Sequence, residues 1–158
     1  MSEFSNDVNS APFAVVAWQQ AVLQNPRLYL GATPTGQSIA RAIDRSARIL
    51  GSGRTALSQA GGWWIYSAET DWLFNSAVPF DRTLDVFDGF NPFPEPGEAN
   101  WFRTECLCLP FSEQVYTATA CRTDVLKGRP ASSEAQQAHR SAAIFAGRSI
   151  VYRLKDSG

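Results

Sequence analysis

The clearest periodic pattern of the chain lies between residues 35 and 51. Apolar side chains recur there at steps of four, four and three residues, at Ile39, Ile43, Ala47 and Leu50. On a helix of 3.6 residues per turn these positions form one apolar stripe, which is typical of a helix packed against a core. Glycines at 51 and 53 can end this helix. Its opposite face carries four charged side chains, Arg41, Asp44, Arg45 and Arg48.

Two further helices are predicted, one before and one well after this segment. Ser10 can cap a helix over residues 12–24, and Pro26 prevents its continuation. A short extended piece is then expected at residues 28–31. Farther along the chain, Ser133 and Gln136 have the spacing of a capping box. This spacing predicts a helix that runs to about residue 146.

After residue 61 the pattern becomes typical of β-strands, with short runs rich in aromatic and β-branched residues. Such runs occupy residues 63–67, 71–75 and 83–87, and a hairpin turn is expected at residues 68–70. Residues 115–125 alternate as a strand does, and residues 148–156 form a last strand. Residues 100–110 fit either a helix that ends at Pro110 or an alternating strand. The prolines and glycines of residues 88–98 predict an exposed loop.

Together these elements predict an α+β fold. We expect a two-layer sandwich, with about three helices packed on one face of a mostly antiparallel sheet of five to six strands. A length of 158 residues suits one domain, and 44% hydrophobic with 18% charged residues is typical of a globular chain. Residues 1–10 are polar and are expected to be a flexible tail rather than a signal peptide, so that residues 11–158 form a single domain.

Charge and cysteine content narrow the possible chemistry. A net charge of −1 gives the chain no general attraction for nucleic acid or for an anionic membrane. The three cysteines, at 106, 108 and 121, have no C-x-x-C spacing, so free thiols in a reducing cytoplasm are expected. His139 is the one histidine, which leaves little from which to build a Ser-His-Asp triad or a histidine-rich metal centre. The sequence thus predicts a cytoplasmic protein with neither metal nor cofactor.

Six short segments follow one another in an order known from one enzyme family. They are NPRLYLG at 25–31, RAIDRS at 41–46, VFDGFN at 86–91, LPFSE at 109–113, YTATACRTD at 116–124 and GRSIVYRL at 147–154. This order resembles the ATP-binding domain of the gyrase B-type (Bergerat-fold) ATPases, and Asp44 and Ser46 match the helix signature of that family. The resemblance implies that the arginine-bearing helix face stands where the related enzymes hold Mg-ATP.

The departures from the family pattern fall on the residues that hydrolysis needs. Arg41 stands in place of the glutamate general base, and a guanidinium cannot accept a proton at neutral pH. Arg45 stands in place of an asparagine that helps to hold magnesium, and its charge repels a dication. Phe87 replaces the adenine-binding aspartate, although Asp88 is adjacent, and a proline-rich loop replaces the glycine-rich lid. The resemblance therefore implies that ATP hydrolysis is lost and that the chain is not an enzyme.

Binding is the function that remains, and arginines and aromatic residues are the candidates for it. The arginine face is either an ordinary solvated helix face or a cationic patch for carboxylates of a partner protein. Trp63 and Trp64 point to opposite faces of a strand, so one belongs to the core, and the other is either covered by a helix or exposed. Tryptophan and arginine are frequent in interface hot spots. The predicted partner-binding residues are Arg41, Asp44, Arg45, Arg48, Trp63, Trp64, Trp72, Phe90 and Phe93.

These features predict a non-catalytic protein-binding module. Its partner is expected to be a protein such as a bacterial toxin, which the chain would neutralise as an inhibitor or immunity protein, with no role for nucleic acid or membrane. The alternative is a nucleotide- or small-ligand-binding domain of Bergerat-like fold without hydrolysis. An enzyme of unrecognised type is a third possibility, and a pocket that holds a carboxylate of raised pKa would be its sign.

Overall fold

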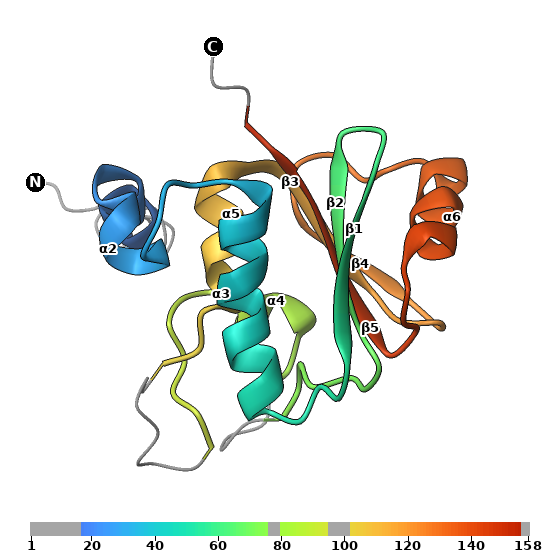
Figure 1. Cartoon of the computed structure of the whole chain (residues 1–158), viewed down its shortest axis with the longest axis horizontal. Helices are drawn as coiled ribbons and strands as arrows, with labels where there is room; N and C mark the ends of the chain where they lie inside the picture. The colour runs from blue at the N-terminus through green and yellow to red at the C-terminus, as the bar shows by residue number, and fades with distance from the viewer. Residues whose placement is uncertain (1–16, 76–79, 95–101, 156–158) are drawn as a thin grey trace, which may run out of the picture.

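A five-stranded antiparallel sheet forms the centre of the protein, in a computed structural model that describes residues 17–75, 80–94 and 102–155 (Figure 1). Its strands are β1 (Thr55–Ala60), β2 (Trp63–Ala68), β3 (Ser112–Ala118), β4 (Thr123–Lys127) and β5 (Arg148–Leu154). Their order across the sheet is β1-β2-β5-β3-β4, and all neighbouring pairs are antiparallel. The last strand therefore lies between two hairpins, and β1 and β4 are the edges of the sheet.

The first hairpin is closed by a turn of two glycines. Gly61 and Gly62 have φ angles of 58° and 84°, which fit a type I′ turn and which side-chain-bearing residues rarely adopt. The register of the hairpin starts with the pair Ala60 and Trp63. The prediction that strands begin only after residue 61, with a turn at 68–70, is wrong. It missed β1 because that strand contains no aromatic residue and only one β-branched residue.

Most of the helices pack on one face of the sheet. They are α2 (Pro26–Leu30), α3 (Gly36–Ile49), α4 (Thr83–Val86), η1 (Glu105–Leu107) and α5 (Cys108–Phe111), and residues 17–24 are also helical. Their apolar side chains join those of the sheet in one large cluster, in which Ile39, Ile43 and Tyr152 are fully buried. The predicted α+β class, an antiparallel sheet with helices packed on one face, is confirmed, except that the helix predicted from residue 133 onward lies on the other face.

A further helix, α6 (Ser133–Ala142), lies on the opposite side of the sheet from α3 (Figure 1). Beneath it is a second buried cluster of Trp63, Ile65, Tyr116 and Val151. Trp64 points to the other face and packs against the large cluster that α3 helps to form. The two tryptophans therefore face opposite sides as predicted, and of the two possibilities for the second one, coverage by a helix is confirmed.

The local sequence explains where α3 begins. Thr35 Oγ1 accepts a hydrogen bond from Ser38 N at 3.0 Å, and Ser38 Oγ accepts one from Thr35 N at 2.8 Å, which together form a capping box. Gly36 packs so closely on Trp64 that a Cβ atom would overlap the indole ring. The Tyr152 hydroxyl donates to the Gly36 carbonyl at 2.7 Å. These contacts fix the start of α3 on the sheet.

A buried ion pair holds the segment after β2 against η1. Arg103 and Glu105 are each 1% exposed, and their Nη2 and Oε2 atoms are 2.5 Å apart. Trp72 Nε1 donates to the same Oε2 atom at 2.9 Å. Arg103 also donates to the carbonyls of Leu73 at 2.9 Å and Asn75 at 3.3 Å. This network accounts for the burial of Trp72.

Several predicted elements differ in type. Residues 26–30 form α2 instead of an extended piece, because Pro26 suits a first helical turn and Gly31 ends the helix with φ 73°. Residues 83–86 form α4, and residues 71–75 contain no strand. Of the two interpretations of residues 100–110, the helical one is confirmed by η1 and α5 over residues 105–111.

Other elements differ in their boundaries. The strand expected over 115–125 is a hairpin of β3 and β4, in which Thr119 N donates to Arg122 O at 2.9 Å across the turn. Helix α6 is capped by Ser132, whose Oγ accepts from Ala135 N at 3.1 Å, and it ends at residue 142 rather than 146. The predicted tail, and residues 12–16 of the first predicted helix, lie outside the described residues.

Candidate functional site

The arginine face of α3 is exposed to solvent, as the sequence predicts. Arg41, Arg45 and Arg48 are exposed, and Asp44 among them is half-buried. Arg48 pairs with Asp44 one turn earlier, with 2.7 Å between Nε and Oδ2. Within the part of the chain that the structure describes, no ion pair involves Arg41 or Arg45. Because both side chains are exposed, their guanidinium groups are accessible to carboxylates of another molecule.

Asp44 connects α3 to the first hairpin. Its carboxylate accepts hydrogen bonds from the Tyr66 hydroxyl on β2 and the Thr55 hydroxyl on β1, both at 2.7 Å, in addition to the bond from Arg48. Burial by itself would raise the pKa of Asp44, but the three hydrogen bonds outweigh it and lower that pKa. Burial of the phenol raises the pKa of Tyr66, and the Asp44 carboxylate that accepts its hydrogen bond raises this pKa further. Asp44 is thus an ionised anchor of the helix.

A groove of about 270 Å³ lies between α3 and β1, directly beside this anchor. Ala40 and Leu57 supply apolar lining, Tyr66 and Asp44 close one part of it, and Arg41 belongs to its wall. The groove follows an edge strand, so it is open along the side where the sheet ends. Two predicted site residues, Arg41 and Asp44, are brought together here.

The aromatic candidates are placed mainly in the interior. Trp63, Trp72 and Phe93 have exposed fractions of 8%, 1% and 6%. Trp64 and Phe90 are half-buried, and the Phe90 ring stacks on Tyr29 and meets Trp18 edge to face. Packing inside the fold accounts for the positions of these five residues.

The motif residues of the ATPase resemblance do not share one surface. Ser46 is buried, and its Oγ accepts from Thr104 N at 2.7 Å, whereas Asp44 and Arg41 line the groove. Asp88 is largely exposed and is not among the groove residues; partial desolvation of its carboxyl group and the nearby charge of Asp85 raise its pKa. The resemblance itself stays a prediction.

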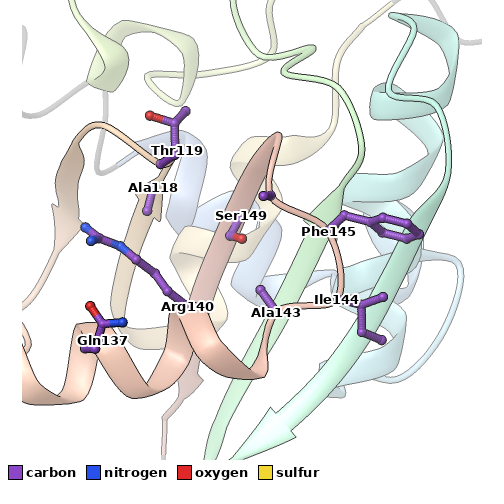
Figure 2. A pocket seen from close by; sticks show the side chains of 10 residues that line it. Ala118, Thr119, Gln137, Arg140, Ala143, Ile144, Phe145 and Ser149 are labelled. Atoms are coloured by element: carbon purple, nitrogen blue, oxygen red, sulfur yellow. The ribbon is translucent and has the colours of Figure 1, made fainter.

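A separate cavity of about 390 Å³ lies where α6 ends (Figure 2). Polar side chains of Thr119, Gln137, Arg140 and Ser149 line it together with apolar ones such as Ile144. Figure 2 shows that these residues come from α6, from the segment that follows it, and from the neighbouring ends of β3 and β5. The sequence analysis missed this site, because its residues are up to 31 positions apart in pairs such as Ala118 and Ser149, which only the sheet pairing makes neighbours.

The only histidine belongs to the packing between α6 and the sheet. His139 is 6% exposed, its Nδ1 is hydrogen-bonded to the Tyr116 hydroxyl, and its ring lies 4.9 Å from that of Trp63. Burial lowers the pKa of His139 and raises the pKa of Tyr116. We therefore interpret His139 as a structural residue.

Comparison of the chain with protein-family models, curated proteins and solved structures finds no match in any of the three. In the described ranges, no group of three or more His, Cys, Asp or Glu side chains is arranged to hold a metal ion. None of the helices found in those ranges is both long and apolar enough to cross a bilayer. Burial raises the pKa of the Cys106 and Cys108 thiols, which are enclosed, while Cys121 is exposed.

Proposed function

We propose that the chain is a non-catalytic protein-binding module that holds an acidic surface of a partner protein against the arginine face of α3. The observation that carries this proposal is that Arg41 and Arg45 are both exposed on α3, and that Arg41 belongs to the wall of an open groove with apolar lining. Arginine suits such a surface because its planar guanidinium can bind a carboxylate through two hydrogen bonds. An apolar groove next to it adds buried contact area, which charge pairs at a rim do not supply.

The finer part of the proposal concerns the partner. From the sequence we infer an inhibitor or immunity protein that masks a partner such as a bacterial toxin in the cytoplasm. The exposed arginines support the part of this hypothesis that requires a complementary acidic surface. Long-range attraction between such surfaces increases the association rate and weakens with salt.

Charge reversal tests the proposal. The tagged chain is used to capture proteins from its source cell, and the captured protein is identified by mass spectrometry, purified and measured by calorimetry. Arg41→Glu/Arg45→Glu should weaken the purified complex at least tenfold, and 0.5 M salt should weaken the wild-type complex. The matched control is Arg129→Glu/Arg153→Glu, which makes the same charge change at two exposed arginines away from α3. Equal affinity of both double variants would contradict the proposed surface.

The cavity at the end of α6 favours a second candidate function, the binding of a small anionic ligand. Arg140 supplies the positive charge of this cavity, and its Nη2 atom lies 2.5 Å from Thr123 Oγ1, which holds the side chain in place. Mg-ATP, AMP and acetate are suitable probes, because each offers an anion to the guanidinium. A ligand that binds should raise the melting temperature of the wild-type chain, by linkage, but not that of Arg140→Ala. Arg129→Ala serves as the control for loss of an arginine elsewhere.

A further inference from the structure

The backbone of β1 has one side that the sheet does not use. Glu69 N donates to Arg54 O at 2.9 Å, and a two-residue turn makes its flanking residues a hydrogen-bonded pair. Hydrogen-bonded and non-bonded pairs alternate along antiparallel strands, so the even-numbered residues of β1 bond to β2. The N–H and C=O groups of the odd-numbered residues Thr55, Leu57 and Gln59 therefore point away from the sheet. In the described parts of the chain, no other hydrogen bond reaches these groups.

The sequence of β1 lacks the features that usually keep edge strands from pairing. Natural edges carry charges, prolines or bulges, which prevent another strand from adding to them. β1 reads TALSQA, without charge or proline, and its register with β2 is regular throughout. The other edge strand, β4, differs: it contains Asp124 and Lys127, and its pairing with β3 has an irregularity. The side chains of Asp124 and Thr123 are also hydrogen-bonded to other elements.

The side chains of β1 face α6 on one side of the sheet and α3 on the other. Ser58 Oγ donates to the Ala142 carbonyl of α6 at 3.0 Å, so the even-numbered side chains face α6. Thr55 faces α3 through its bond to Asp44, so the odd-numbered side chains line the α3 side. Side chains directly opposite each other on antiparallel strands share a face. A residue added opposite Leu57 would thus point into the groove of about 270 Å³.

We propose that an extended acidic segment of the partner protein adds as a sixth strand to the free edge of β1, with one aliphatic side chain in the α3–β1 groove and a carboxylate on Arg41. This inference rests on the proposed function and specifies how the partner binds. Because strand side chains alternate, the aliphatic and the acidic residue are two positions apart. Main-chain hydrogen bonds then supply affinity, while the groove and the arginine select the sequence.

Charge decides against a second copy of this chain as the occupant. Twofold antiparallel pairing of β1 with β1 would place both α3 helices on one face of the joined sheet. The exposed Arg41 and Arg45 of each copy would then approach those of the other, and like charges repel. An acidic segment has the opposite charge and meets no such cost.

A library of random octapeptides displayed on phage, selected on the full chain, supplies the probe. Selected peptides are expected to contain an aliphatic residue two positions from an acidic one. Methylation of single backbone nitrogens of such a peptide should weaken binding at least tenfold at every second position and less than threefold between them. Amide exchange at Thr55, Leu57 and Gln59 should slow when the peptide binds.

Leu57→Pro tests the same edge from the side of the protein. This substitution removes the N–H group of residue 57, which points away from the sheet, and edge strands tolerate proline at such positions. Leu57→Val is the control, because it keeps the N–H group. Peptide affinity should fall at least tenfold for the first variant only. If Leu57→Pro does not fold, as judged by circular dichroism, the methylation series and the amide exchange decide alone.

Three results would overturn the inference. The first is that no peptide from the library protects these three amides from exchange. The second is that methylation of the backbone nitrogens does not change the affinity of a selected peptide. The third is that the chain forms a dimer in analytical ultracentrifugation and that Leu57→Pro abolishes this dimer. Failure of the proposed function looks different. In that case Arg41→Glu/Arg45→Glu leaves the partner complex intact, whatever happens at β1. If charge reversal abolishes binding of the partner but Leu57→Pro does not, the proposed function holds and the inference of an added strand is wrong.

Discussion

Glu105→Gln tests the buried ion pair with the smallest change in shape. In the native protein, two carboxylate oxygens accept N–H groups from Arg103 and Trp72, and both charged side chains are almost completely excluded from water. Glutamine keeps one acceptor oxygen and turns an NH₂ group toward the same donors. The Arg103 charge then stays buried without its counter-charge.

The cost follows from this environment. Removing one partner of a buried pair destabilises a protein by about 3–5 kcal/mol, and the remaining amide oxygen puts this variant near the lower value. For a chain of 158 residues, about 3 kcal/mol corresponds to a fall in melting temperature of about 6–12 °C. The measurement is urea unfolding followed by circular dichroism, together with a thermal scan.

Glu113→Gln is the matched control, because it is the same substitution in an exposed ion pair. The side chains of Glu113 and Arg153 are 43% and 48% exposed, and the Oε2 and Nε atoms are 3.5 Å apart. Pairs of that kind contribute about 0–1 kcal/mol. Arg103→Met/Glu105→Leu removes both charges and should be less destabilising than Glu105→Gln alone. If Glu105→Gln lowers the free energy of unfolding no more than Glu113→Gln does, the argument from the uncompensated charge is wrong.

Three shorter predictions concern other parts of the fold. Burial lowers the pKa of His139, so its contribution to stability is complete above about pH 6.5 and declines as the pH falls below that value; urea unfolding at several pH values should show this decline in the wild type and not in His139→Gln. Gly36→Ala should cost about 1–3 kcal/mol, because the new Cβ atom overlaps Trp64, whereas Gly89→Ala adds a methyl group in open space and should leave the melting temperature unchanged. Among the three cysteines only Cys121 should react with a thiol reagent in the native state, and all three should react in urea.

Helix α3 shows what can be predicted from a local sequence pattern alone. The apolar stripe through Ile39 and Ile43 predicted both the bounds of α3 and the exposure of its arginines, because burial of one helix face follows directly from the spacing of residues. The same logic predicted opposite directions for Trp63 and Trp64. The final strand was also predicted, over residues 148–156, and β5 occupies Arg148–Leu154; its centre, Ile150, Val151 and Tyr152, consists of the β-branched and aromatic residues that are typical of strands.

The secondary-structure predictions were wrong where the local sequence pattern was weak or fitted both a strand and a helix. β1 has only one β-branched residue and is held by its pairing with β2, while residues 83–87 have the composition of a strand but contain the short helix α4. Pairing and packing supply more free energy than the intrinsic preference of such short segments, so the preference does not decide their structure.

For this protein the sequence by itself determined the α+β class, the helix that carries the arginines, and the residues that could form a cationic face. Only the tertiary structure decided that Asp44 neutralises Arg48 and leaves Arg41 beside a groove, and that β1 is an edge strand of the sheet. The physical reason is that periodicity tells which side of an element is buried, but which element covers it depends on contacts between residues far apart in the chain. Strand order, and therefore the edge that is open to a partner, belongs to that second kind of information.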